Sequence, residues 1–180
     1  DVCSSDLKDT YLLDTTKSSA IWTGEKVTGK HMGTISIKSG ELTNKNGQMT
    51  GQFELDMNSI VCTDLKGEGK TKLEGHLKDD DFFGVRKYPV ASFVITSVKP
   101  LSGVEPGKPN FNVNGKLTIK GITNALSFPV LLRFNDSGLN VTGTARVDRT
   151  KFDIRYGSKT FFEGIGDKAI YDDFTLELNI

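Results

Sequence analysis

The stretch Asn110–Lys120, with the sequence NFNVNGKLTIK, alternates apolar and polar side chains at nearly every second position. Its apolar members fall on one face: Phe111, Val113, Leu117 and Ile119. Asparagine, lysine and threonine occupy the other face. A period of two is that of a β-strand, because successive side chains point to opposite faces. The stretch therefore predicts a half-buried antiparallel strand with one dry and one wet face.

The same period recurs along much of the chain and predicts strands at 35–37, 49–57, 91–98, 126–134, 139–147 and 174–180. The sequences Asn44–Gly47 and Asn135–Gly138 lie between such runs and are typical of tight hairpin turns. From Gly69 to about Lys78 the pattern changes, because Leu73 and Leu77 lie four residues apart among polar residues. That spacing predicts a short amphipathic helix. About eight short strands separated by turns favour an all-β barrel or sandwich, folded as one domain.

The charge balance excludes two classes of partner. The 180 residues include 23 Lys and Arg and 23 Asp and Glu, so the formal net charge is zero. Nucleic-acid binding rests on clustered cations, and so does binding to an anionic membrane surface. The longest apolar run, Phe128–Leu132, is far shorter than the roughly 20 residues that a membrane-spanning helix needs. We therefore expect no nucleic-acid partner and no transmembrane segment.

The start of the chain and its two cysteines leave alternatives open. The chain begins at Asp1, and we interpret it as a processed or trimmed product. Residues 1–10 are assigned to an N-terminal tail and residues 11–180 to the domain. Cys3, which precedes Ser4–Asp6, is a candidate for a lipidated terminus. A disulfide with Cys62 and a free thiol are the alternatives.

Motifs for catalysis and cofactor binding are absent from the sequence. There is no Gly-x-Ser-x-Gly elbow, no phosphate-binding loop and no dinucleotide-binding fingerprint. The two histidines, His31 and His76, have no neighbouring Cys or His at zinc-ligand spacing. We therefore predict no catalytic residues, no metal site and no cofactor. An enzyme that uses either histidine with nearby acids stays open as the less favoured alternative.

The inward face of the predicted strands mixes large and small residues. Phenylalanines share it with small residues, which are Gly51, Gly115, Gly143 and Ala145. Small residues on an inward face leave room for a ligand, so the pattern is compatible with an apolar cavity. It is equally compatible with a filled core, in which the small residues accommodate the curvature of the barrel.

Three stretches resemble a known family. Leu73–Phe93, which contains the residues DDDFFGVRKYPVASF, is similar to the signature stretch of the YceI-like family. Val113–Thr123 is similar to its second recurring stretch, and Arg149–Ile154 to a third with an Arg-x-x-Phe pattern. The block Asp14–Leu42 also fits in order, so the resemblance covers nearly the whole chain.

The resemblance implies a lipocalin-like closed antiparallel β-barrel of about eight strands with a short helix over one end. Members of the family are bacterial and commonly exported, and several hold polyisoprenoids, quinone-like molecules or other long-chain amphiphiles inside the barrel. The implied partner is thus a long-chain lipid or isoprenoid. The implied localisation is periplasmic or secreted, with Cys3 as a lipid anchor if it is lipidated. Some relatives pair, so a homodimer stays open.

Strand parity, and not the resemblance, selects the residues expected to bind the ligand. The predicted lining is Phe53, Leu55, Phe93, Ile95, Phe111, Val113, Leu117, Phe128, Val130, Leu132, Val141 and Phe174. Leu77, Phe82 and Phe83 are expected to gate or cap one end. The predicted function is non-catalytic binding, with sequestration or transport of a polyisoprenoid, a quinone-like molecule or a fatty acid or amide. The alternative is a filled-core envelope module, for stress response or adhesion, that acts through its surface.

Overall fold

The computed structural model describes residues 7–162, 164 and 166–180. Cys3 and most of the predicted N-terminal tail lie outside these residues. The elements in chain order are β1 (Lys8–Leu12), β2 (Ser19–Lys26), β3 (Gly29–Lys45), β4 (Gln48–Cys62), α1 (Gly67–Lys78), β5 (Val90–Pro100), β6 (Phe111–Ile119), β7 (Ile122–Asn135), β8 (Gly138–Asp148), the 3₁₀ turns η1 (Arg149–Phe152) and η2 (Gly166–Lys168), and β9 (Ile170–Asn179).

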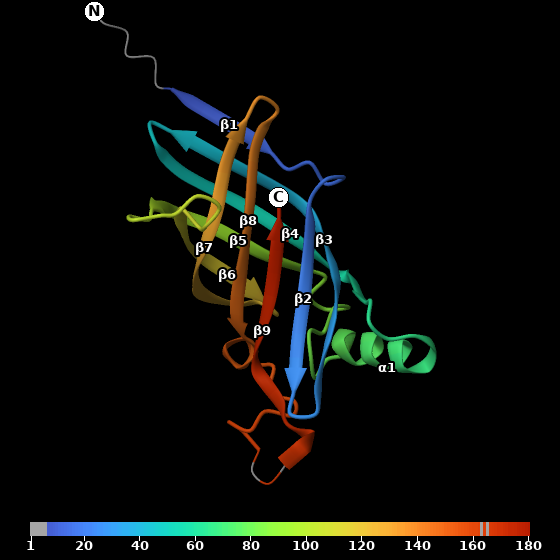
Figure 1. The fold of residues 1–180 in the computed structure, drawn as a ribbon. Helices are drawn as coiled ribbons and strands as arrows, with labels where there is room; N and C mark the ends of the chain where they lie inside the picture. Colours follow the sequence, from blue (N-terminus) through green and yellow to red (C-terminus); the bar gives the residue numbers. More distant parts are fainter. Residues whose placement is uncertain (1–6, 163, 165) are drawn as a thin grey trace, which may run out of the picture.

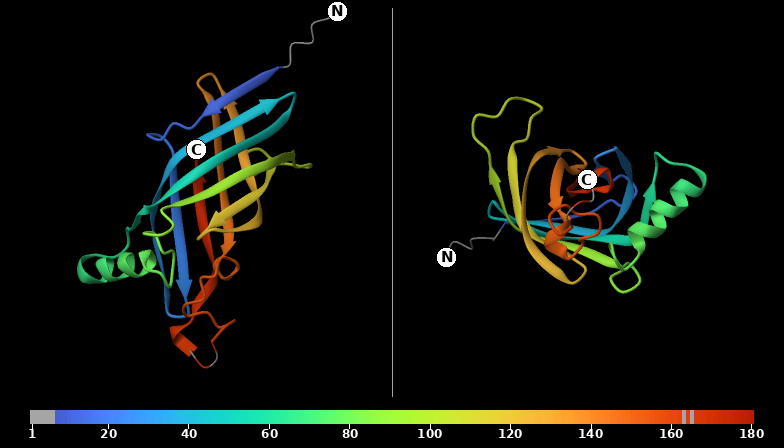
Figure 2. Two further views of the ribbon diagram at one scale, coloured as in Figure 1. Left: turned by 180° about the vertical axis from the view of Figure 1, so that it is seen from behind. Right: turned by 90° about the horizontal axis from the view of Figure 1, so that it is seen from below.

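Eight strands close into an antiparallel barrel, as predicted. From β2 to β9 each strand pairs with the next along the chain, and β9 pairs with β2 to complete the ring. Figure 1 shows the barrel from the side, and the right-hand view of Figure 2 shows it from below. Strand β1 stands outside the ring and pairs only with the last part of β3. Residues 8–10, which sequence patterning assigned to the tail, belong to this strand.

The predicted turns and helix are present. Asn46 and Gly47 both have positive φ, 52° and 83°, as a two-residue hairpin turn between β3 and β4 requires. The predicted helix is α1, which begins two residues earlier than expected and ends at Lys78. It lies at one end of the barrel, extends outward from the wall and packs against β4 (Figure 1). None of its residues is buried.

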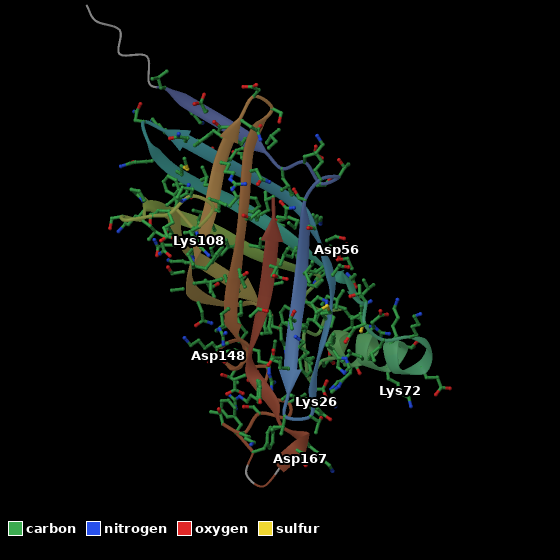
Figure 3. The ribbon with its side chains drawn as sticks, in the orientation of Figure 1. Lys26, Asp56, Lys72, Lys108, Asp148 and Asp167 are labelled. Carbon is green, nitrogen blue, oxygen red and sulfur yellow. The ribbon has the colours of Figure 1, made fainter. Side chains whose placement is uncertain are left out.

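The two ends of the barrel differ, and we name them after β1 and α1. The β1 end carries the β3–β4 and β7–β8 hairpins and the β5–β6 loop (Figure 1). The α1 end carries the helix and the segment 149–169 that joins β8 to β9. Figure 3 places Lys26, Asp148 and Asp167 there. In the described residues no helix is long and apolar enough to span a membrane.

Candidate ligand-binding cavity

The barrel interior holds an apolar cavity of about 100 Å³. Seven of the eight barrel strands, β3 to β9, contribute to its wall. The lining residues are Ile37, Leu42, Phe53, Leu55, Ser92, Phe93, Ile95, Val98, Val113, Leu117, Leu126, Phe128, Val130, Leu132, Val141, Gly143, Ala145, Leu176, Leu178 and Ile180. Ser92 alone has a polar side chain. It is paired with Glu54 and Thr118, so its side chain belongs to the outer face of the sheet. The inner wall is therefore formed by hydrocarbon.

Ten of the predicted ligand-binding residues line this cavity. They are Phe53, Leu55, Phe93, Ile95, Val113, Leu117, Phe128, Val130, Leu132 and Val141. Phe111 and Phe174 do not, although both lie on barrel strands. Phe111 is the first residue of β6, at the β1 end, and packs against the side of the core there. Phe174 lies nearer the α1 end, where its ring meets that of Phe83 with centroids 6.1 Å apart.

Other lining residues were not predicted because β-bulges change the parity within a strand. Of the two bulges in the pairing of β3 with β4, the one between Ile37 and Ser39 lets Ile37 and Leu42 both face inward although they are five positions apart. A bulge in β5 does the same for Ile95 and Val98. The others, Leu126, Gly143, Ala145, Leu176, Leu178 and Ile180, follow regular alternation and could have been found from it.

The inward glycines are closely approached by their neighbours. Gly143 and Ala145 line the cavity, but a β-carbon at Gly143 would lie 2.9 Å from Cγ1 of Val130. A β-carbon at Gly115 would lie 2.6 Å from the ring of Phe93, and Gly40 on β3 is covered in the same way by Phe53. The glycines therefore accommodate neighbouring side chains, and Gly143 and Ala145 also border the cavity.

The α1 end of the barrel is closed by side chains. Phe82 is buried there with Phe152 and Ile154, in the cluster that fills this half of the barrel. Leu77 and Phe83 pack against the same cluster from the outside. All three predicted gating residues lie at this end, and none of them lines the cavity.

Arg149 holds the closed end together. It is 2% exposed and donates hydrogen bonds of 3.0 Å to the carbonyl oxygens of Ile154, Ile170 and Tyr171. Its guanidinium also lies 5.5 Å from the centre of the Phe82 ring. In the sequence, only the Arg-x-x-Phe resemblance marks this arginine. In the structure, its side chain ties three backbone carbonyl groups together.

The β1 end is less tightly covered. Val98, Val141 and Ile180 line the cavity and are only half-buried. Beyond them, Tyr11 of β1 meets Phe134 of β7 with ring centroids 6.2 Å apart. Phe134 is 56% exposed although it shares the inward parity of β7. The cavity lining at this end is thus more accessible than the buried Phe82 cluster at the α1 end.

Each histidine is paired with a carboxylate. His31 Nδ1 lies 3.0 Å from Asp64 Oδ2, and the Cys62 thiol donates to the other oxygen of Asp64 at 3.0 Å. Burial and this hydrogen bond raise the pKa of Cys62, so its thiol stays protonated at neutral pH. His76 pairs with Asp81 at 3.3 Å. Among the described residues, no group of three His, Cys, Asp or Glu side chains could hold a metal ion.

A larger hollow of about 470 Å³ lies between β2, β8, β9 and the segment that follows η1. Several of its charged groups have partners. Arg146 lies 3.6 Å from Asp173, and Asp172 accepts hydrogen bonds from Ser158 and Thr160. Burial works against the ionisation of Asp172, but these hydrogen bonds and the charge of Arg149 outweigh it and lower the pKa. The interior cavity, with its hydrocarbon wall from seven strands, is the stronger candidate site for an apolar ligand.

Comparison with known proteins agrees with this barrel. Residues 11–180 match the model of the YceI-like domain. The chain belongs to the YceI-like family. A UPF0312 protein of Pseudomonas putida strain W619 is 30% identical over 120 residues, which are 64% of this chain and 58% of that relative. The match thus spans less than two thirds of the curated relative.

Two solved structures share the fold of this YceI-like chain. Burkholderia cenocepacia BcnA superimposes with a TM-score of 0.70 at 21% identity, over 93% of this chain and 97% of that one. A domain from Saccharophagus degradans, described as polyisoprenoid-binding, gives a TM-score of 0.66 at 16% identity, over 93% and 94%. At these identities the likeness concerns the fold alone.

Proposed function

We propose that this YceI-like protein binds a long-chain apolar or amphiphilic molecule inside its barrel and sequesters or transports it without chemical change. The observation that carries the proposal is the continuous hydrocarbon wall contributed by seven strands. Each methylene group that leaves water for such a wall contributes about 0.8 kcal/mol. A polyisoprenoid, a quinone with an isoprenoid tail or a fatty amide supplies many such groups.

Two further observations support this class of ligand. The Saccharophagus degradans domain with the same fold is described as polyisoprenoid-binding. The inward-facing Phe53, Leu176 and Leu178 are only half-buried although the barrel surrounds them, because they border the cavity. A periplasmic or secreted localisation, an anchor at Cys3 and a homodimer are further parts of the proposal, drawn from the family.

The first test is mass spectrometry of the purified protein, native and then after extraction with organic solvent. We expect a bound species that extracts into the solvent. Clean apoprotein that also fails to take up added isoprenoids, quinones and fatty amides would contradict the proposal and favour a module that acts through its surface.

The second test fills the cavity. Val113→Trp and Val141→Trp each place an indole into the lining and should abolish ligand retention while the barrel still folds. The control is Val94→Trp on β5, because Val94 is 42% exposed on the outer face. Circular dichroism of all three variants checks the fold. Full retention by both interior variants would remove the cavity as the binding site.

A further inference from the structure

Two phenylalanines in the cavity wall occupy paired positions on neighbouring strands. Phe53 on β4 is directly opposite Phe93 on β5. Paired residues have their β-carbons about 5 Å apart on the same face of the sheet. Both side chains line the cavity. Two rings that start this close together can stack on each other or lean apart, and their direction decides how much space is left between them.

The Phe53 ring leans toward β3, where it lies over Gly40. This glycine is the partner of Phe53 on the side away from β5. A β-carbon at Gly40 would overlap Cδ1 of the ring and lie 2.5 Å from its Cε1. The next nearest atom is Cβ of Leu13, at 3.2 Å. The ring can therefore lie close against the barrel wall because position 40 has no side chain.

The Phe93 ring leans the opposite way, toward β6. A β-carbon at Gly115 of β6 would lie 2.6 Å from Cζ and 2.7 Å from Cε2, at the outer end of the ring. Phe128 of β7 lies farther in the same direction, with its ring centroid 5.7 Å from that of Phe93. Strands β3 and β6 flank the β4–β5 pair on opposite sides, so the Phe53 and Phe93 rings diverge.

The cavity is small enough for the position of one ring to matter. Its volume is about 100 Å³, and both rings border it. Phe53 and Phe93 are only half-buried although they point into the barrel. A ring that moved away from its glycine would project into this space. One methylene group more or less in an apolar pocket changes affinity roughly 10- to 200-fold, so a small displacement of a ring has a measurable effect on binding.

We infer that two glycines, Gly40 and Gly115, set the width of the ligand channel. Each lets one phenylalanine ring lie against the barrel wall, and the apolar chain of the ligand lies between the two rings. The glycines are positioning residues, because they contact the rings and do not line the cavity themselves. A methyl-branched isoprenoid chain is wider than a straight alkyl chain, so this width decides how well branched chains bind. The inference rests on the proposed function, since it needs a ligand in the cavity.

The first experiment displaces one ring. Gly40→Ala is the better choice, because a β-carbon at Gly115 would also overlap the backbone carbonyl oxygen of Val94. The probes are farnesol and n-dodecanol, two alcohols with main chains of equal length, of which only farnesol is methyl-branched. Displacement of the apolar fluorophore N-phenylnaphthylamine measures their dissociation constants. We expect Gly40→Ala to weaken the binding of farnesol about tenfold more than that of dodecanol.

Two further variants separate the position of the ring from the stability of the barrel. Gly24→Ala on β2 adds the same methyl group where nothing lies within 4 Å, so it should leave both affinities unchanged. Phe53→Leu removes the ring over Gly40, so Gly40→Ala in this background should have little further effect on either alcohol. Such non-additivity is typical of residues in contact. Circular dichroism checks the fold of every variant.

The outcomes separate the two proposals. If the wild-type protein binds neither alcohol and retains no extractable ligand, the proposed function fails and this inference fails with it. If the wild type binds both alcohols and Gly40→Ala weakens them equally, or weakens farnesol just as much in the Phe53→Leu background, the proposed function stands and the role of the glycines is refuted. If Gly40→Ala does not fold, Phe53→Leu alone decides: it should shift the preference toward farnesol, and an unchanged preference refutes the inference.

Discussion

Replacing Arg149 with methionine should cost the protein much of its stability. Methionine keeps a long side chain against the Phe82 ring but removes three charged donors from the carbonyl oxygens of Ile154, Ile170 and Tyr171. A hydrogen bond from a charged group contributes about 1.5–3 kcal/mol. Desolvation of the guanidinium offsets part of that gain in the native protein. We therefore expect a loss of roughly 3–5 kcal/mol in the free energy of unfolding.

The matched control is Arg146→Met, three residues earlier at the end of β8. The side chain of Arg146 is 73% exposed and meets Asp173 at 3.6 Å, so this exposed ion pair contributes about 1 kcal/mol or less. Urea denaturation followed by circular dichroism measures both variants, and thermal melting should show a fall of roughly 6–20 °C for Arg149→Met. Equal stabilities of the two variants would refute the structural role of the buried arginine.

Three further predictions concern stability and reactivity. Folding lowers the pKa of Asp172, so the ionised carboxylate stabilises the protein fully above the ordinary carboxyl pKa, and this stabilisation is lost as the pH falls through the lowered pKa of the folded state. Asp172→Asn should therefore make the free energy of unfolding fall less steeply as the pH is lowered into the acid range. Gly33→Ala should destabilise by about 1–3 kcal/mol or more because its β-carbon would overlap the backbone carbonyl oxygen of Val61 and then the Trp22 ring, whereas Gly24→Ala, with nothing within 4 Å, should be far milder in the same denaturation assay. In a Cys3→Ser variant, the fully buried Cys62 should react with a thiol reagent only after unfolding, and rapid labelling of the native protein would contradict its placement.

The sequence was informative where one face of a strand is dry and the other wet. The regions 110–120 and 139–147 alternate strictly, and both are barrel strands with the expected face inside. β2 was not predicted, because its inward residues are Ala20, Trp22 and Gly24, which differ too much in size to form an apolar pattern. β1 was not predicted because Tyr11 is its one residue that is not fully exposed.

The cavity was harder to predict than the barrel, and the reason is geometric. Alternation finds inward residues only until a bulge shifts the register, as in β3 and β5. Volume is harder still, because an inward glycine can border the cavity or lie beneath a neighbouring side chain. Gly143 borders the cavity and Gly115 does not, although a β-carbon at either position would meet a neighbour, Val130 or the Phe93 ring.

The difference between the two ends of the barrel determines how a ligand could be held. At the α1 end, Phe82, Phe152 and Ile154 are buried in one cluster, and Arg149 donates to the carbonyl oxygen of Ile154. At the β1 end, the lining is half-buried, and the aromatic contact between Tyr11 and Phe134 is partly exposed. A molecule that enters there meets a wall of hydrocarbon. The end that enters first must therefore tolerate an apolar wall, which an alkyl or isoprenoid chain does and a charged head group does not.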